Sequence, residues 1–441
     1  MLRFLISIGL GIAVQIAPAG PGLADASGVE TIHANPTDYL SKIARLRPGD
    51  TLLLEAGVYR RGLTLKSLHG QPGKPIIIGG PADRSAIILG RVCCSTVELR
   101  EASYLMLRNL TLDGARYRYK DGIKATGVTH NVTIQNILIV RYGSHQQTVG
   151  ISTKAPAWDW AIRRNVIIGA GTGIYLGDSD GSAPFVRGLV ENNVVIDTIG
   201  YGMQIKHQNA RPDIAAMPTD KGVTTIRYNV FAKAVQPTAG YQAARPNLLV
   251  GHFPPHGPGA EDRYEIYGNL LYQNRTDQPL FQGEGNFAFH DNLLVNDYGS
   301  GIWVQAHNDT PRRVAIFNNT IVARELGIKV ADGDPEFTQR VVGNAVFSGQ
   351  GIRAQDQRDN VQDSYAKADA YLNMAAGEAR HLDLYPRCGV LAGAPIDLEE
   401  FSEYRDYDKD FNRFPRRGRY RGAYAGCNKN AGVPAGRRLM P

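Results

Sequence analysis

Short apolar runs recur along the chain, and most of them open with a glycine followed by an aliphatic residue. This phrase occurs at Gly122–Ile123, Gly150–Ile151, Gly173–Ile174, Gly202–Met203, Gly301–Ile302, Gly327–Ile328 and Gly351–Ile352, with weaker copies at Asn247–Leu248 and Pro279–Leu280. Most successive copies start about 22 to 32 residues apart. A repeat of this period is one supersecondary unit that cannot bury its apolar face alone, so neighbouring units must stack.

A second phrase, asparagine before an aliphatic run, alternates with the first. It begins at Asn109, Asn136, Asn165, Asn193, Asn229, Asn269, Asn292, Asn319 and Asn344. Short β-branched strands separated by Gly and Asn turns predict an all-β fold, a solenoid of single-stranded parallel β-helix coils. We expect the asparagines to stack as a ladder at one turn, with side-chain hydrogen bonds between coils.

The two ends of the repeat predict different structures. Residues 38–46 predict a short amphipathic helix that caps the open apolar end of the solenoid. After residue 355 the repeat fades, and a short helix is expected over residues 365–377 before an irregular tail rich in Arg and Tyr. We therefore expect a β-helix domain over residues 27–355 and a C-terminal extension, residues 356–441, packed on it.

Two long intervals in the repeat predict insertions beside one stretch of coils. The extra material includes residues 208–221, residues 234–245 and the Pro-rich run 252–258. Insertions on a solenoid collect on one face and often build the binding site. These loops should therefore wall a groove beside the coils that start at Gly202 and Asn247.

Outward positions on the strands supply a candidate binding surface. Counting two residues along from each leading Gly, Asn or Pro gives Tyr175, Gln204, Leu249, Phe281 and Trp303. Aromatic rings one coil apart form an apolar strip suited to stacking on sugar rings, although a strand surface covered by a loop has the same pattern. Gln282 and His307 are included in the expected substrate-binding surface.

Titratable residues gather at the ends of the same strands. The fourth position carries Lys154, Gly177, Lys206, Gly251, Gly283 and Gln305, and the fifth carries Asp178, His207, His252, Glu284 and Asp332. Because neighbouring coils lie about 4.8 Å apart, the candidate catalytic residues Lys206, His207, His252 and Glu284 should lie within a few ångströms of one another. Each of them alone is more typical of an ordinary polar surface position.

The residues of this cluster and the arginines near it can each be given a candidate chemical role. Burial and nearby like charges would lower the pKa of Lys206 and make it a better base. His252 and His207 could act as the general acid or donate hydrogen bonds to a carboxylate. Arg211, Arg227 and Arg245, on or near the insertions, are candidates for binding the carboxylate of an acidic sugar.

The first residues predict export. Arg3 is followed by the apolar stretch 4–17 and by Ala24-Asp25-Ala26, as in a secretory signal peptide with an Ala-x-Ala cleavage site. The apolar run is shorter than the roughly 20 residues that a membrane span needs. We expect residues 1–26 to be removed, leaving a secreted or periplasmic protein, without membrane insertion and monomeric.

The net charge suggests a class of partner, and the cysteines suggest one disulfide bond. The net charge is +7, and no nucleic-acid-binding motif is present, so an anionic extracellular polysaccharide is the expected partner. A solvated basic tail would give the same charge. Among the four cysteines, Cys388 and Cys427 could close the C-terminal loop, whereas the adjacent Cys93 and Cys94 are expected to be unpaired or buried, because a bond between neighbours is strained.

Residues 48–59, 73–78 and 105–112 form one set of segments that carries a family resemblance, and residues 205–231 contain another. The first set is similar to the N-terminal coils of the chondroitinase B and alginate lyase family of right-handed β-helix polysaccharide lyases. Ile205-Lys206, Asn209 and the run Arg227-Tyr228-Asn229-Val230-Phe231 are similar in order to its catalytic lysine, the asparagine after it and a following turn. The resemblance implies a right-handed β-helix in which Lys206 removes the proton next to a uronic acid carboxyl group.

The chain departs from this family at two places. Gly251 stands where the family has an arginine, so only His252 remains of that pair. Residues 199–202 offer no carboxylate where the family binds calcium, and Asp178-Ser179-Asp180-Gly181 lacks the acidic residue that would complete a calcium loop. No cofactor is therefore expected, and calcium stays open as an alternative whose family ligands are not matched.

Three classes of function remain open from the sequence. The first is an exported lyase acting on an acidic polysaccharide by β-elimination. The second is a glycoside hydrolase, with Glu284 paired with Asp178 or Asp309, or a uronan epimerase, on the same scaffold. The third is a non-catalytic protein that binds carbohydrate or assembles envelope polysaccharide.

Overall fold

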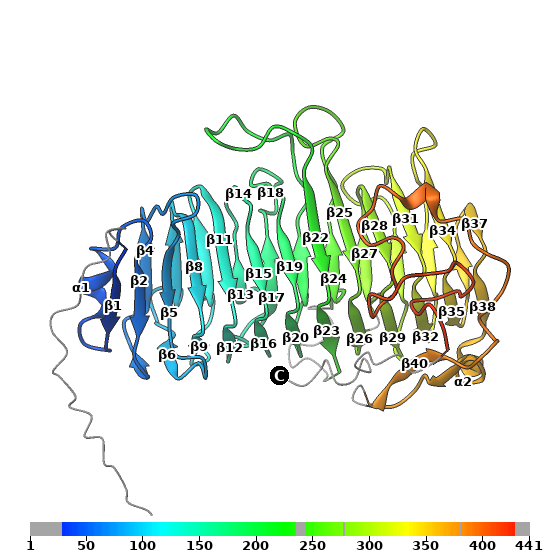
Figure 1. Cartoon of the computed structure of the whole chain (residues 1–441), viewed down its shortest axis with the longest axis horizontal. Coiled ribbons are helices and arrows are strands. Elements are labelled where there is room, and N and C mark those ends of the chain that lie inside the picture. Colours follow the sequence, from blue (N-terminus) through cyan, green and yellow to red (C-terminus); the bar gives the residue numbers. More distant parts are fainter. Residues whose placement is uncertain (1–28, 235–243, 277, 379–380, 428–441) are drawn as a thin grey trace, which may run out of the picture.

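The computed structural model shows a right-handed parallel β-helix (Figure 1). It describes residues 29–234, 244–276, 278–378 and 381–427. The predicted signal peptide lies outside these residues. Three parallel sheets, here called A, B and C, run along the solenoid. A complete coil contributes one strand to each sheet, whereas the first and last rungs are incomplete and two coils add β14 and β18 to sheet A.

The strands of each sheet follow one another in sequence order along the solenoid axis. Sheet A contains β1 (Thr31–Ala34), β2 (Thr51–Leu54), β5 (Ile76–Gly79), β8 (Ser103–Arg108), β11 (Thr129–Gln135), β15 (Ala161–Arg163), β19 (Leu189–Glu191), β22 (Val223–Arg227), β25 (Arg263–Tyr267), β28 (Phe287–His290), β31 (Val314–Phe317), β34 (Gln339–Val342) and β37 (Asp356–Arg358), with β14 (Ala157–Trp158) and β18 (Phe185–Val186) beside them. Sheet B contains β3 (Gly57–Tyr59), β6 (Ala86–Leu89), β9 (Thr111–Asp113), β12 (Leu138–Val140), β16 (Val166–Ile168), β20 (Val194–Ile196), β23 (Val230–Lys233), β26 (Leu270–Asn274), β29 (Leu293–Asn296), β32 (Thr320–Ala323), β35 (Ala345–Ser348) and β38 (Val361–Asp363). Sheet C contains β4 (Leu63–Lys66), β7 (Val97–Arg100), β10 (Ile123–Thr126), β13 (Val149–Ser152), β17 (Thr172–Leu176), β21 (Met203–Ile205), β24 (Leu248–Val250), β27 (Phe281–Gly283), β30 (Ile302–Val304), β33 (Ile328–Val330) and β36 (Ile352–Arg353).

A ladder of buried asparagines joins the coils at the turn between sheets A and B. Its members are Asn165, Asn193, Asn229, Asn269, Asn292, Asn319, Asn344 and Asn360, and each Nδ2 donates to the next Oδ1 at 2.9–3.1 Å. The ladder is as predicted, except that Asn109 and Asn136 stand one position earlier, with φ of +57° and +51°. They occupy the left-handed residue of the turn, which asparagine tolerates well, and Asn136 donates to Asn109 separately.

The N-terminal end is capped as the sequence predicts. Helix α1 (Tyr39–Ile43) is shorter than the expected residues 38–46, and it buries Tyr39 and Ile43 against the first coils. The Tyr39 ring meets the Tyr59 ring edge-on, with ring centroids 5.0 Å apart. This contact closes the apolar interior at that end.

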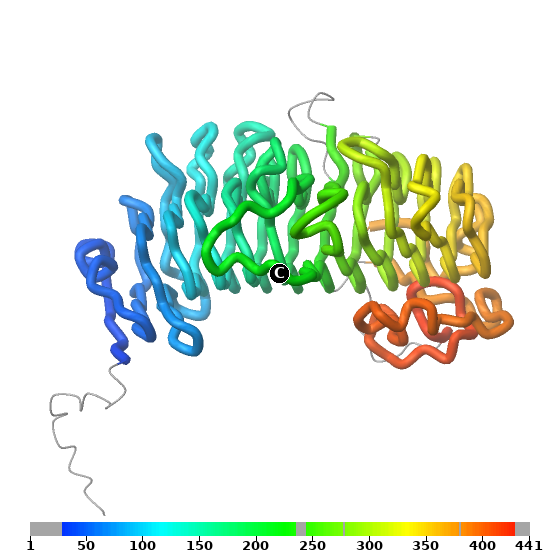
Figure 2. Tube along the Cα trace, turned by 90° about the horizontal axis from the view of Figure 1, so that it is seen from above, coloured from blue at the N-terminus to red at the C-terminus, as the bar shows by residue number. Residues whose placement is uncertain are grey.

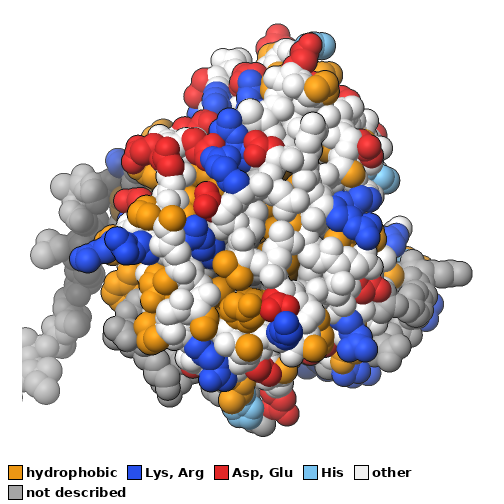
Figure 3. All heavy atoms as spheres, turned by 90° about the vertical axis from the view of Figure 1, so that its right-hand side faces the viewer, with side chains coloured by type: hydrophobic (Ala, Val, Ile, Leu, Met, Phe, Trp, Pro, Cys, Tyr) orange, Lys and Arg blue, Asp and Glu red, His pale blue; other side chains and the backbone are white. Residues whose placement is uncertain are grey.

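The coils continue past residue 355, where the sequence predicted that they stop. Strands β37 and β38 extend sheets A and B by one more rung. All three residues of β37 are exposed, and Arg340 and Arg358 form ion pairs with Glu400 beside them. Charged side chains are therefore spread over this end of the molecule, which discourages pairing with another chain (Figure 3).

The C-terminal segment packs on the outside of two sheets. It contains the 3₁₀ turn η2 (Tyr365–Lys367), helix α2 (Ala368–Tyr371), the antiparallel pair β39 (Leu372–Met374) and β40 (Asp383–Pro386), and η4 (Glu399–Phe401). The helix expected over residues 365–377 thus ends at Tyr371, because the next residues pair with β40 instead. Figure 2 shows this segment lying along one flank of the later coils.

Buried apolar clusters show which sheets the C-terminal segment covers. Leu384, Phe411 and Tyr424 pack on outward residues of sheet B. Ile396 and Phe401 pack on outward residues of sheet A, including Phe317. Sheet C contributes no residue to these two clusters, so within the described residues the apolar side chains of the C-terminal segment do not pack on its outer face.

Both cysteine pairs are disulfide-bonded. Cys388 and Cys427 are joined as the sequence suggested. Cys93 and Cys94 form a bond between neighbours and neither is buried, so the expectation that they are unpaired or buried is wrong. Within the described residues no helix has both the length and the apolar character needed to cross a membrane.

Candidate functional site

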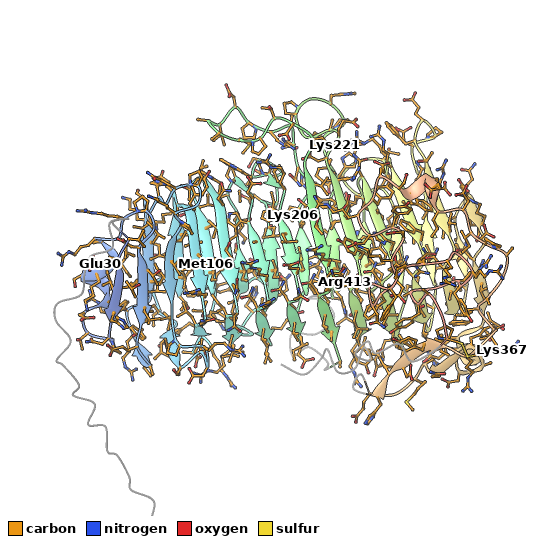
Figure 4. The ribbon with its side chains drawn as sticks, viewed as in Figure 1. Glu30, Met106, Lys206, Lys221, Lys367 and Arg413 are labelled. Atoms are coloured by element: carbon orange, nitrogen blue, oxygen red, sulfur yellow. A yellow bond between two sulfur atoms is a disulfide. The ribbon has the colours of Figure 1, made fainter. Side chains whose placement is uncertain are left out.

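Lys206 lies midway along the solenoid, directly after β21 of sheet C (Figure 4). It lines a cavity of about 340 Å³, here called the Lys206 cavity. The lining residues are Gln146, Gln147, Val149, Lys154, Thr172, Tyr175, Asp178, Ser179, Tyr201, Gln204, Lys206 and Arg245. The predicted groove beside Gly202 is therefore present, and it holds four of the predicted site residues: Lys206, Tyr175, Gln204 and Arg245.

The register of sheet C explains why these side chains meet. Tyr175 pairs with Gln204, and Gln204 pairs with Leu249, so the three form one outward column. Lys206 follows two residues after Gln204, and side chains two apart on a strand lie on the same face. Tyr201 and Arg245 enter the cavity from the turns that precede β21 and β24.

Lys206 is a half-buried amine with mixed electrostatic surroundings. Burial lowers the pKa of Lys206, the negative charge of Glu284 opposes that shift, and Arg245 adds to it. The direction matches the one predicted from the sequence. A lysine whose pKa is lowered spends more time as the neutral amine that can accept a proton.

The charge of Glu284 acts on Lys206 across a glycine, Gly251. Val250 pairs with both Ile205 and Gly283, which puts Gly251 and then Glu284 in the position of Lys206 on the next two coils. A Cβ at Gly251 would lie 2.3 Å from the His207 backbone nitrogen, so no side chain fits between the two. Glu284 is 1% exposed, and burial raises its pKa. It acts on the charge of Lys206 and lies beyond the reach of a substrate, contrary to the direct catalytic role predicted for it.

The two histidines line a second cavity next to the first. This cavity of about 250 Å³, here called the histidine cavity, is bounded by His207, Gln208, Asn209, Ala210, His252, Pro254, Pro255, His256, Asn308 and Asp309. The predicted insertions over residues 208–221 and 252–258 therefore wall this site, and they rise above the coils in Figure 1. The insertion predicted over residues 234–245 lies almost entirely outside the described residues. Lys206 and His207 are consecutive residues that face the two cavities.

The surroundings of both histidines favour the neutral imidazole. Burial lowers the pKa of His252, and Nε2 of that ring donates to the Thr310 carbonyl oxygen at 3.3 Å. Burial, with Lys206 next, lowers the pKa of His207. His307 is exposed and lies close enough to Glu284 to influence its ionisation. Neutral imidazoles suit hydrogen bonds to sugar hydroxyls.

Two arginines predicted to bind substrate lie elsewhere. Arg211 is buried inside the insertion, where it forms an ion pair with Asp262 and donates to the Asp220 carbonyl oxygen at 3.0 Å. Arg227 lies on sheet A and bridges Glu191 and the Tyr267 hydroxyl, at 2.8 and 3.0 Å. Neither guanidinium is therefore available to a ligand in the Lys206 cavity.

The register of β27 shows that the predicted aromatic strip is wrong at Phe281. Phe281 pairs with Leu248 and Ile302 and points into the core at 0% exposure. The outward residue is its neighbour Gln282, which pairs with Leu249 and Trp303. Gln282 and the half-buried Trp303 continue the outward column but are absent from the lining of the Lys206 cavity.

Sequence reasoning overlooked two residues of the Lys206 cavity. Lys154 occupies the position of Lys206 two coils earlier, and its Nζ lies 4.7 Å from the centre of the Tyr175 ring. Tyr201 stands one residue before the leading Gly202, and Arg245 lies 5.9 Å from its ring centre. Lys154 stands in the fourth-position series of the sequence, where it was given no role. Tyr201 lies in a turn, so only the structure shows that it lines the cavity.

Both tyrosines of the cavity keep their protons. Burial raises the pKa of Tyr175 to about 12, and burial also raises the pKa of Tyr201. Among the described residues, no group of three or more His, Cys, Asp or Glu side chains is arranged to hold a metal ion. The arrangement offers a basic amine, cationic side chains and protonated phenols around one cavity.

Comparisons with known proteins define the fold. No model of a protein family matches the sequence, and no similar sequence was found among curated proteins. An alginate lyase from Paenibacillus sp. superposes with a TM-score of 0.52 at 15% identity, over 74% of this chain and 99% of the lyase. A lacto-N-biosidase from Eubacterium ramulus gives 0.49 at 12% identity, over 77% and 68% of the two chains. A PL6 family polysaccharide lyase from Pseudopedobacter saltans gives 0.46 at 12%, over 76% and 93%. The likeness to the alginate lyase confirms the parallel β-helix.

Proposed function

We propose that this protein is an exported polysaccharide lyase that cleaves a uronate-containing polysaccharide by β-elimination, with Lys206 as the base. The observation that carries the proposal is the half-buried amine of Lys206, which has a lowered pKa and shares one cavity with Arg245, Lys154 and two protonated tyrosines. The structurally similar alginate lyase supports this reaction class. It also supports a uronan as the substrate.

The reaction needs a base beside a neutralised carboxylate. The neutral Lys206 amine takes the proton from the carbon that bears the uronate carboxyl group. The electron pair left on that carbon forms a double bond to the neighbouring ring carbon as the glycosidic C–O bond breaks. Negative charge builds on the carboxylate during this step, and Arg245 and Lys154 supply the positive charge that stabilises it.

The departing sugar oxygen must receive a proton. Tyr201 and Tyr175 line the same cavity and remain protonated at neutral pH, so either phenol can donate. This assignment replaces the predicted roles of His207 and His252, which face the histidine cavity. We assign the histidines to contacts with the adjoining sugar.

The hydrolase alternative fits the geometry less well. Retaining or inverting hydrolysis needs two carboxylates on either side of one bond. Asp178 and Asp309 line different cavities, and Glu284 is 1% exposed. An epimerase shares the proton abstraction at Lys206 and differs in the fate of the intermediate, so the products must separate the two.

A screen of acidic polysaccharides tests the proposal. Alginate, polygalacturonate and chondroitin are incubated with the protein, and both ultraviolet absorbance of the new double bond and reducing ends are followed. The proposal expects the two signals to rise together, and to be lost in Lys206→Ala but retained in Lys221→Ala, an exposed lysine in the insertion above the coils (Figure 4). Reducing ends without absorbance would identify a hydrolase. Solvent deuterium gained by an uncleaved polymer would identify an epimerase.

A further inference from the structure

A third cavity lies further along the outer face of sheet C, toward the N-terminus. Its volume is about 350 Å³, and it is lined by Cys93, Cys94, Ser95, Glu98, Arg100, Tyr119, Lys120, Lys124 and Thr126. The bonded pair Cys93–Cys94 forms part of one wall. No residue of this cavity takes part in the proposed reaction.

The register aligns this cavity with the Lys206 cavity. Lys124 pairs with Ser152, Ser152 with Tyr175, and Tyr175 with Gln204. Lys124 therefore stands in the same outward column as two lining residues of the Lys206 cavity, and three rungs, about 14 Å, separate it from Gln204. A polymer lying along the solenoid axis would cross both cavities.

Both cavities are lined by more basic than acidic side chains. Together they are lined by six basic side chains, Arg100, Lys120, Lys124, Lys154, Lys206 and Arg245, and by two carboxylates, Glu98 and Asp178. Glu98 is already in contact with Arg100 at 3.2 Å and Arg91 at 3.6 Å. The lysines from both cavities also act on one buried carboxyl, Asp121, although burial is the larger effect and raises its pKa.

An exposed aromatic ring stands at the rim of the third cavity. Tyr119 is 59% exposed, and its ring centre lies 4.7 Å from that of His145. Its backbone nitrogen donates to the Thr148 hydroxyl at 3.2 Å, which fixes the loop that carries it. A large aromatic side chain held in solvent beside two half-buried lysines is suited to stack on a sugar while the lysines bind an acidic group.

We propose that the cavity beside Cys93–Cys94 is a distal subsite for an anionic sugar of the same polysaccharide chain. Lys120 and Lys124 bind the acidic group, and Tyr119 stacks on the ring. This inference rests on the proposed function for the identity of the polymer. It adds that the enzyme holds a long stretch of chain, which runs along the solenoid axis from the Lys206 cavity toward the N-terminus.

The test measures binding separately from cleavage. In the Lys206→Ala background, calorimetry follows the binding of polymannuronate, polygalacturonate and chondroitin, with neutral dextran as the negative control. Lys120→Ser/Lys124→Ser is expected to weaken binding of the anionic polymer at least tenfold, and Tyr119→Ala several-fold. The matched control, Lys221→Ser/Lys367→Ser, removes the same charge from the insertion and the C-terminal end (Figure 4) and should change binding less than twofold.

Substrate length gives the second readout. With Lys206 intact, the Lys120→Ser/Lys124→Ser variant should raise KM for the polymer and leave kcat unchanged, while disaccharide and trisaccharide substrates should be cleaved as by the parent protein. Thermal unfolding of each variant checks that the fold is kept.

The outcomes separate the subsite from the proposed reaction. Polymer binding that depends on Lys120 and Lys124, without any cleavage by the parent protein, supports the subsite and overturns the elimination reaction. Cleavage that proceeds while the Lys120→Ser/Lys124→Ser variant binds polymer like the control overturns the subsite alone. Failure of every anionic polymer to bind overturns the subsite as well.

Discussion

At Lys206, burial and a neighbouring negative charge act in opposite directions. Burial favours the neutral amine, whereas Glu284, two coils away, favours the ammonium ion. The net pKa is lowered, so the neutral base is present at a lower pH than for a free lysine. Among the described residues, Lys206 and Glu284 form no ion pair, so no direct contact with a carboxylate holds the proton on the amine.

The elimination rate should therefore rise with pH through the lowered pKa of Lys206 and level off above it. Lys206→Arg keeps the positive charge, but a guanidinium does not lose its proton, so we expect activity to fall by about 10²–10⁴-fold. Initial rates of ultraviolet absorbance between pH 5 and pH 10 measure this, with Lys221→Arg as the control. A rate that falls as pH rises across the lysine titration would contradict Lys206 as the base.

Another lysine, Lys233, is fully buried and holds the backbone of Arg245 in place. Its side chain is nearly inaccessible, and Nζ donates to the Arg245 carbonyl oxygen at 2.8 Å. Asn274 donates to the same carbonyl at 2.9 Å. Burial, with a smaller effect of Arg245, lowers the pKa of Lys233 to about 7. Two donors thus fix the backbone from which the Arg245 guanidinium enters the Lys206 cavity.

Lys233 should make stability depend on pH. Its folded pKa of about 7 lies below the ordinary value of 10.5, so between these values the unfolded chain binds more protons and stability rises with pH. Lys233→Met should remove this slope, which is at most about 1.4 kcal/mol per pH unit. Urea unfolding at pH 7, 8 and 9 measures it. Parallel pH curves for the two proteins would show that Lys233 is not buried uncharged.

At the scale of the strand, Gly251 decides how closely two coils approach. An added Cβ would lie 2.3 Å from the His207 nitrogen and 2.6 Å from the Lys206 carbonyl carbon. Gly251→Ala should therefore cost about 1–3 kcal/mol of stability and displace Lys206 from the cavity, with loss of activity. Gly426→Ala, where nothing lies within 4 Å of the added carbon, is the control. Equal stability and activity of the two variants would mean that Gly251 is replaceable.

The period of the repeat was predictable, but the register of each strand was not. Side chains alternate between the two faces, so a slip of one residue exchanges core and surface. Such a one-residue slip occurred in the prediction for β27. In the structure Leu280, and not Pro279, is equivalent to the leading glycine of the next strand, Gly301. The error placed Phe281 on the surface instead of in the core. It also assigned Glu284 to the fifth position of its repeat, although it occupies the fourth, the position of Lys206.

The site was predictable to the extent that it lies on strands. Tyr175, Gln204 and Lys206 follow from the alternation of side chains along β17 and β21. Tyr201 could not be found in this way because it belongs to a turn. Arg211 was misplaced because its partner, Asp262, lies 51 residues later, and charge in a sequence does not reveal which carboxylate will be near.

At the scale of the whole molecule, the C-terminal segment lies away from the sheet that carries Lys206. Its apolar residues pack on sheets A and B, and the Cys388–Cys427 bond closes a loop with a sequence separation of 39. A loop of this length contributes about 4 kcal/mol in the chain-entropy model. The bond stabilises a cover on the far sides of the solenoid from Lys206.

The double variant Cys388→Ser/Cys427→Ser should therefore unfold its C-terminal segment more readily and still be active at low temperature. Limited proteolysis, with assays of polymer cleavage on the same samples, measures both properties. Full loss of activity while the coils remain folded would show that the C-terminal segment also supports sheet C.

The mass of the products tests the central claim most directly. Polymer digests of the parent protein and of Lys206→Ala are analysed by mass spectrometry. β-Elimination by Lys206 predicts fragments with an unsaturated end, each lighter by one water than the hydrolysis fragment of the same length, and no fragments from the variant. Fragments with the full hydrolysis mass, or unsaturated fragments that persist without Lys206, would contradict it.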